Sequence, residues 1–188
     1  MDALFVSTAL VALAEIGDKT QLLALLLAAR FKKPWPIIAG IVVATILNHA
    51  LAGVLGNWLA EQVSVLWLNL SLAACFLAVA GWTLIPDKLD DEPSLLDRYG
   101  AFLATLVAFF IAEMGDKTQV ATVMLAAQYS DLVLVIIGTT GGMLLANVPV
   151  IWLGNRAANN LPLHWIRRAA AVFFLLMACY ALWRAFNP

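Results

Sequence analysis

Apolar and polar positions alternate in long blocks along this chain. Six apolar runs follow one another, separated by short connections that contain proline and charged residues. A helix needs about 20 apolar residues to cross a bilayer, so each run predicts one transmembrane helix. The first and fourth runs are longer than this, and we expect their helices to tilt or bend, with Gly17 and Gly115 permitting a break inside them. The runs are residues 3–29, 34–57, 64–85, 100–128, 131–154 and 165–186.

The composition agrees with an all-α integral membrane protein. Hydrophobic residues make up 63% of the 188 residues and charged residues 12%, whereas soluble domains have about 45–50% and about 25%. The net charge of −1 gives no reason to expect a nucleic acid partner. The two cysteines, Cys75 and Cys179, lie in apolar runs without CxxC spacing, and we expect them to be small core residues.

An eight-residue phrase occurs at the same place in the first and fourth runs. AEIGDKTQ at 14–21 returns as AEMGDKTQ at 112–119, with seven positions identical and an offset of 98 residues. The same offset relates Gly40 to Gly138 and continues to the end of both halves. The sequence therefore indicates an internal duplication without gaps.

The duplication predicts how the chain is organised in the membrane. Residues 1–188 are expected to form one domain, with a first repeat at 1–85, a linker at 86–99 and a second repeat at 100–188. Because each repeat has three spans, the second enters the membrane upside down. The predicted fold is six transmembrane helices in two inverted three-helix repeats, with long, bent first and fourth helices.

Equivalent connections of the two halves carry opposite charge bias. Arg30, Lys32 and Lys33 follow the first run, whereas the equivalent residues of the second half carry no positive charge. Positive residues stay in the cytoplasm, so we predict that both termini lie outside and that the linker is cytoplasmic. The acidic linker is interpreted as a solvated connector or as a weak cation-sensing loop. The residues assigned to the cytoplasmic side are Arg30, Lys32, Lys33, Lys88, Arg98, Arg156, Arg167 and Arg168, with only Arg184 opposite.

Each phrase places two carboxylates and an ammonium where hydrocarbon would normally lie. Burying such charges costs several kcal/mol unless they pair, meet water or bind a cation. Glu15 and Asp18 are three residues apart, so they share a helix face that Gln21 continues. Inverted repeats bring equivalent broken helices together at the midplane, so both phrases are expected to converge. The predicted ligands are Glu15, Asp18, Gln21, Glu113, Asp116 and Gln119, with the hydroxyls of Thr20 and Thr118 beside them.

The predicted donor set favours a hard divalent cation. Carboxylate, amide and hydroxyl oxygens suit Mg²⁺, Ca²⁺ or Mn²⁺. Four carboxylates with Lys19 and Lys117 sum to −2 when all are ionised, which one divalent cation neutralises. Without the cation, crowded carboxylates in a low dielectric take up protons. Competition between metal and protons predicts a cation/proton antiporter. The lysines offer no acceptor atom, so they are expected to pair with a carboxylate of the other repeat or to reach towards the interface.

Other polar residues within the spans are weaker candidates. Asn48 and Asn147 are interpreted either as extra oxygen ligands or as polar contacts between helices. His49 is interpreted as a proton relay or as another such contact. Four glycines are expected to let helices approach closely, namely Gly53, Gly56, Gly138 and Gly142.

Two E-x-G-D-[KR]-[ST] phrases in a six-span chain resemble one transporter family, matched here by residues 15–20 and 113–118. It includes the Golgi calcium/manganese–proton antiporters of eukaryotes, chloroplast manganese transporters and bacterial manganese exporters. The resemblance covers essentially the whole chain. It implies export of Mn²⁺ or Ca²⁺ from the cytoplasm, coupled to proton entry, with the acids of the phrases as ligands. The short form is similar to bacterial plasma-membrane members. The metal is then the transported substrate, the other partners are protons and lipid, and no prosthetic group is expected.

Several alternatives stay open from the sequence. The phrases are also compatible with a salt-bridge lock, with an exporter of basic amino acids or with a passive divalent channel. Asp18 and Asp116, on separate helices, are also compatible with the aspartate pair of an intramembrane aspartyl protease. However, such enzymes carry G-x-G-D rather than E-x-G-D, and their Pro-Ala-Leu segment is absent. We therefore do not expect an enzyme.

Overall fold

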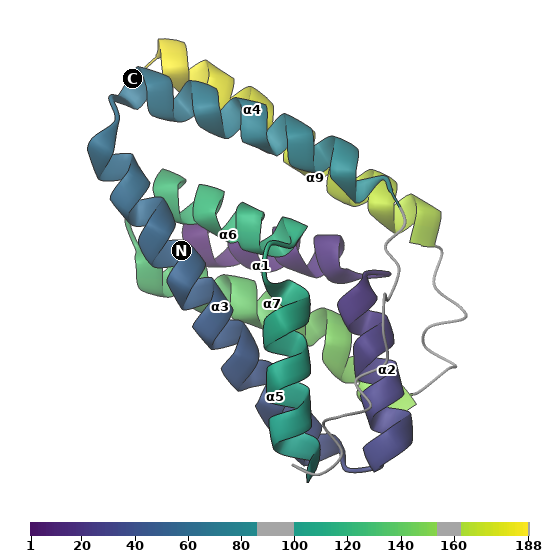
Figure 1. Ribbon diagram of the computed structural model, residues 1–188. Coiled ribbons are helices and arrows are strands. Elements are labelled where there is room, and N and C mark those ends of the chain that lie inside the picture. Colours follow the sequence, from purple (N-terminus) through teal and green to yellow (C-terminus); the bar gives the residue numbers. More distant parts are fainter. Residues whose placement is uncertain (86–99, 154–162, 188) are drawn as a thin grey trace.

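The computed structural model describes residues 1–85, 100–153 and 163–187 (Figure 1). Eight helices and no strands occupy these ranges. The predicted linker 86–99 lies outside the described residues, as does Arg156. The helices are α1 (Asp2–Glu15), α2 (Lys19–Phe31), α3 (Pro34–Gln62), α4 (Val65–Thr83), α5 (Gly100–Glu113), α6 (Lys117–Gln128), α7 (Leu132–Leu153) and α9 (Leu163–Phe186).

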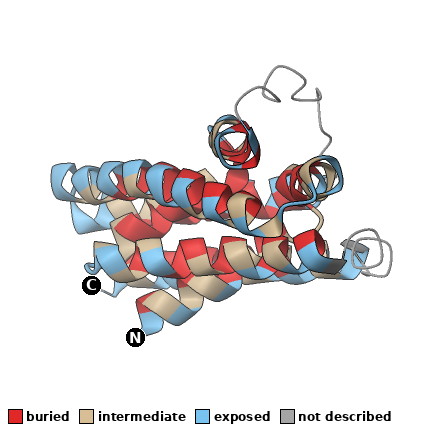
Figure 2. Ribbon diagram, turned by 90° about the horizontal axis from the view of Figure 1, so that it is seen from below, coloured by how far each residue is buried: buried red, intermediate tan, exposed pale blue. Residues whose placement is uncertain are grey.

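The outer surface of the helices is apolar, as a membrane protein requires. Within the described ranges, α3, α4, α7 and α9 are each long and apolar enough to cross a bilayer, and α5 is a shorter apolar helix. Figure 2 shows buried residues on the inward faces of the helices and exposed ones on their outward faces. Many exposed side chains are large and apolar, including Leu51, Ile111, Ile137 and Leu176. The chain is therefore a multi-pass membrane protein.

The first and fourth runs each form two helices rather than one long, bent helix, and each is divided at the glycine where the sequence allowed a break. α1 ends at Glu15 and α2 begins at Lys19, and Gly17 between them has a φ of 82°. α5 and α6 are separated in the same way, with a φ of 75° at Gly115. Glycine reaches this left-handed region without the penalty that a side chain imposes. Figure 1 shows that the helices on either side of each break run in different directions.

The two halves of the chain contact each other through equivalent helices. α3 packs against α5 and α6, and α7 packs against α1 and α2. α4 and α9 form a pair along one edge of the molecule (Figure 1). The rings of Phe76 and Phe174, which are equivalent under the offset of 98, lie 6.3 Å apart in this pair. Helices of one half therefore complete the core of the other.

The cysteines lie on the outer surface, so their prediction as core residues was wrong. Cys75 in α4 and Cys179 in α9 are both exposed. α4 and α9 are each buried mainly on one side, because only 33% of the most apolar 18-residue segment of either helix is buried. An apolar run in a membrane helix does not distinguish the protein-facing side from the side that faces lipid.

The glycines of α7 allow α1 to approach closely, as predicted. A Cβ added at Gly142 would lie 2.6 Å from the carbonyl oxygen of Thr8 and 2.8 Å from the amide nitrogen of Ala12. Both atoms belong to the backbone of α1, so the helices would have to separate. We expect Gly142→Ala to cost about 1–3 kcal/mol of stability, measured by thermal unfolding in detergent. Gly81→Ala is the control, because no atom lies within 4 Å of its added Cβ. Equal melting temperatures for the two variants would contradict this expectation.

Candidate metal centre

The two helix breaks bring acidic residues of both phrases together. Glu15, Glu113 and Asp116 each offer a carboxylate oxygen, and these three oxygens lie within 4.8 Å of one another. The residues are buried, with exposures of 0%, 0% and 2%. Three of the four acids that were predicted to converge therefore meet within this distance of one another. We call these three residues the acidic cluster.

Each glutamate is held by a threonine of its own phrase. The hydroxyl of Thr20 donates to Oε2 of Glu15 at 2.6 Å, and the hydroxyl of Thr118 donates to Oε2 of Glu113 at 2.8 Å. The other oxygen of each glutamate, Oε1, is buried and has no hydrogen-bond partner among the described residues. A buried polar atom without a partner is costly, so these two oxygens are the natural donors for a cation.

The aspartates form ion pairs that cross between the repeats. Nζ of Lys117 lies 2.7 Å from Oδ2 of Asp18, and Nζ of Lys19 lies 3.1 Å from Oδ1 of Asp116. Of the two positions that the sequence allowed for the lysines, pairing with the other repeat is the one observed. With each aspartate matched by a lysine, an ionised Glu15 and Glu113 account for the remaining charge of −2. A salt-bridge lock is therefore present, and it joins each aspartate to the lysine of the other repeat.

Asp18 is placed differently from Asp116. It does not belong to the acidic cluster. Its carboxylate caps α2 by accepting from the backbone nitrogen of Lys19, whereas Asp116 makes no such bond at the start of α6. One predicted ligand thus serves as a helix cap and an ion-pair partner in this structure.

The side-chain oxygens of the two glutamines bond to the backbone at the helix breaks, so they are not free as metal ligands. Oε1 of Gln21 accepts from the backbone nitrogen of Gly17 at 2.9 Å, and Oε1 of Gln119 accepts from that of Gly115 at 2.7 Å. The amide nitrogen of Gln21 donates to the carbonyl oxygen of Ala146 at 3.0 Å. This role was missed from the sequence, although the Gly-x-x-x-Gln spacing is the signal that could have shown it.

The secondary candidates Asn48, Asn147 and His49 differ in the hydrogen bonds that they make. Asn48 donates to the carbonyl oxygen of Phe110 at 3.1 Å and lies 3.5 Å from the amide nitrogen of Gln119. Asn147 donates to the carbonyl oxygen of Met143 at 3.0 Å, while its Oδ1 is buried without a partner in the described ranges. His49 is fully buried, and neither ring nitrogen has a hydrogen-bond partner there. The interhelical polar contact is thus observed for Asn48.

Arg167 reaches the first break from α9, a contact that the sequence analysis missed. Its Nη2 donates to the carbonyl oxygen of Gly17 at 3.3 Å. The equivalent position of the first half is Asn69, which instead bonds to Val65 of its own helix. Arg167 was assigned only to the cytoplasmic charges, because basic residues next to a span are typical of membrane topology. The two breaks are therefore not equivalent in their surroundings.

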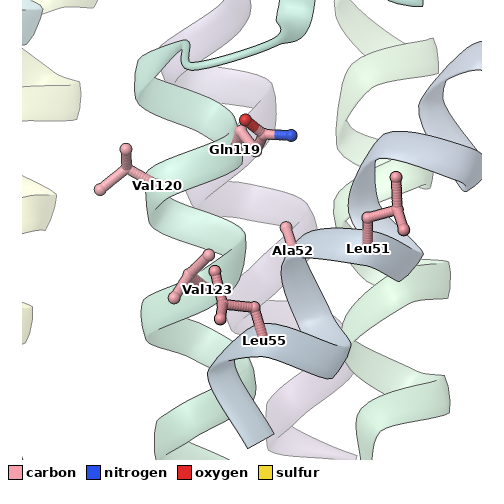
Figure 3. A pocket seen from close by; sticks show the side chains of 6 residues that line it. All are labelled: Leu51, Ala52, Leu55, Gln119, Val120 and Val123. Atoms are coloured by element: carbon pink, nitrogen blue, oxygen red, sulfur yellow. The ribbon is translucent and has the colours of Figure 1, made fainter. Parts of the chain in front are cut away.

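A pocket lies beside the second break. It has a volume of about 290 Å³ and lies between α3 and α6, where Gln119 is the one polar residue among those that line it (Figure 3). Gly115, which bonds to Gln119, is exposed, and Met114 is 58% exposed, whereas Ile16 and Gly17 are partly buried. Gly115 and the residue before it are thus more exposed than their counterparts at the first break. The lining residues are Leu51, Ala52, Leu55, Gln119, Val120 and Val123.

A multi-pass helical protein with buried carboxylates at two facing helix breaks belongs to the class of membrane ion transporters. The chain belongs to the GDT1 family of divalent cation/proton antiporters, whose model matches residues 3–91 and 101–188. This is a transporter family, so the protease alternative is set aside.

Relatives from bacteria and plants cover most of the chain. A protein of Vibrio cholerae named "Putative manganese exporter" is 58% identical over 179 residues, which cover 95% of this chain and 89% of the relative. A "GDT1-like protein 3" of Oryza sativa is 26% identical and covers 93% of this chain and 71% of its own length. A GDT1-like protein of Synechocystis is 24% identical, with 93% of both chains covered. No solved structure matches the chain significantly.

Proposed function

We propose that this protein exports Mn²⁺ from the cytoplasm in exchange for protons, and that its oxygen donors also accept Ca²⁺ as a cargo. The observation that carries the proposal is the acidic cluster of Glu15, Glu113 and Asp116, whose oxygens lie within 4.8 Å of one another inside a membrane protein. The name of the Vibrio cholerae relative supports manganese as the cargo. Oxygen donors of this kind accept both Mn²⁺ and Ca²⁺.

The ligands are proposed to centre on the acidic cluster. Glu15 and Glu113 supply the two buried oxygens that lack hydrogen-bond partners in the described chain. Asp116 supplies a third, and Asp18 stands next to the site through its ion pair with Lys117. Protons compete with the cation for the same oxygens, because crowded carboxylates in a low dielectric favour neutralisation by either one.

The membrane arrangement is proposed to be that of two inverted repeats in a bacterial plasma membrane. Support comes from the equivalent packing of α3 on α5 and of α7 on α1. The ion pairs that exchange lysines between the two phrases support it as well. The positive charges after the first span support the proposal that both termini lie outside and that the linker 86–99 lies in the cytoplasm. Alternating access would then expose the site to each side in turn.

Flux into proteoliposomes tests the proposed function. Vesicles with an acidic lumen are expected to accumulate external Mn²⁺ above its equilibrium level, because protons leaving the lumen drive the metal uphill. A protonophore combined with a potassium ionophore should abolish this accumulation. Accumulation that only reaches equilibrium, with or without the pH gradient, would identify a passive channel. Inhibition by lysine but not by Ca²⁺ would identify an exporter of basic amino acids.

A further inference from the structure

The two ion pairs that cross between the repeats differ in burial. The side chains of Lys117 and Asp18 are 3% and 0% exposed, so this pair is sealed from water. The side chain of Lys19 is 26% exposed, while that of its partner Asp116 is 1% exposed. The two lysines hold equivalent positions in the sequence, so the difference comes from their surroundings. Lys19 is thus partly accessible at the surface of the protein, whereas Lys117 is not.

The aspartates of these pairs differ as well. Asp18 caps α2 and stands outside the acidic cluster. Asp116 belongs to the cluster and makes no capping bond to α6. Its Oδ1 faces Lys19, and its buried Oδ2 has no hydrogen-bond partner within the described segments. The carboxylate of Asp116 is therefore shared between the acidic cluster and the ammonium of Lys19.

A divalent ion on Oδ2 of Asp116 and the ammonium of Lys19 on Oδ1 would lie on the same carboxylate and compete for its charge. Like charges a few ångströms apart repel strongly where little water screens them. An ammonium has no acceptor and cannot join the ligands of a metal. Lys19 is the first residue of α2, close after the break at Gly17, and its side chain is partly exposed at the protein surface.

We propose that Lys19 is a built-in counter-cation that holds Asp116 when no divalent ion is bound and leaves it when one binds. Lys117 stays on Asp18 throughout and serves the structure. The role of Lys19 rests on the function proposed above, because it assumes that the acidic cluster binds the transported ion. Lys19 and Lys117 would then differ in function although the two phrases that contain them are nearly identical.

Chemical labelling of the wild-type protein tests this role. The purified protein in detergent is treated by reductive methylation at increasing Mn²⁺, and methylation of each lysine is followed by peptide mass spectrometry. Labelling of Lys19 is expected to rise over the same concentration range in which Mn²⁺ binds, while labelling of Lys117 stays low. KCl at matched ionic strength should leave both unchanged.

Variants give an independent measurement of the competition. Lys19→Gln is expected to lower the Kd for Mn²⁺ about tenfold, because it removes a positive charge from beside the site. Lys19→Arg, which keeps the charge, should bind as the wild type does. Lys33→Gln removes the same charge from an exposed position at the start of α3 and should change nothing.

The outcomes separate this proposal from the function on which it rests. Binding of Mn²⁺ with unchanged or reduced labelling of Lys19 overturns the role of Lys19 alone. Weaker binding by Lys19→Gln than by the wild type overturns it as well. If the wild-type protein binds no Mn²⁺, the proposed function fails together with this role. Should Lys19→Gln fail to fold, the labelling of the wild-type protein still decides.

Discussion

Replacing Glu113 by glutamine is expected to abolish proton-driven Mn²⁺ transport while leaving the fold intact. The variant lowers the charge of the site from −2 to −1. A unit charge 4 Å away is worth about 4 kcal/mol at an effective dielectric of about 20, and about twice that for a divalent ion. Because the amide oxygen still offers a weak ligand, we expect a loss of at least about 100-fold in Mn²⁺ affinity. Titration of the purified protein and flux into proteoliposomes measure the two effects.

The fold should survive because the local hydrogen bond is kept. The hydroxyl of Thr118 donates to Oε2 of Glu113, and a glutamine oxygen accepts from the same donor. Glu15→Gln should behave in the same way, since Thr20 holds Glu15 equivalently. Glu61→Gln is the matched control, because Glu61 is exposed near the end of α3. Wild-type transport and affinity in Glu113→Gln would remove Glu113 from the ligand set.

Most of the helical fold could be predicted from the sequence, because hydrophobic length and internal repetition are local signals. The offset of 98 residues related positions that the structure indeed brings together, such as Phe76 and Phe174. The pattern also located the two breaks, since Gly17 and Gly115 interrupt the apolar runs next to charged residues. It did not show that the helices would end completely there, because this depends on side chains that satisfy the freed backbone groups.

The candidate site was predicted less completely than the fold. Helical spacing placed Glu15 and Asp18 on one face, but the break between them sends them to different partners. The bonds from Gln21 and Gln119 to glycine nitrogens exist only once the helices are broken. Periodicity assumes a continuous helix, so it fails at the residues where this chain departs from one.

The differences between the two halves could not be predicted from the sequence for another reason. The phrases are nearly identical, so any asymmetry has to come from residues packed around them. Arg167 contacts the first break, while its counterpart Asn69 bonds within its own helix. The pocket beside Gln119 and the exposure of Lys19 likewise depend on how distant helices meet. Such features require the tertiary structure, in which the symmetry of the sequence is lost.

Replacing Lys117 by glutamine is expected to destabilise the protein more than any other single change at the site. Lys117 and Asp18 are sealed from water and lie 2.7 Å apart. Removing one partner of a buried ion pair costs about 3–5 kcal/mol, because the other charge stays in a low dielectric. Lys19→Gln should cost less, about 1–2 kcal/mol, since the side chain of Lys19 is partly exposed and its pair is less deeply buried. Thermal unfolding of both variants in the same detergent gives the comparison.

A second substitution distinguishes loss of charge balance from loss of packing. Asn at position 18 can still cap α2, so Asp18→Asn combined with Lys117→Gln leaves a neutral pair and an intact cap. The double variant is expected to recover part of the stability, with a coupling of about 1–3 kcal/mol between the two positions. If Lys117→Gln instead melts no earlier than Lys19→Gln, burial does not separate the two pairs in energy. The distinction between a structural Lys117 and a displaceable Lys19 would then have no physical basis, because both lysines would stabilise the protein equally.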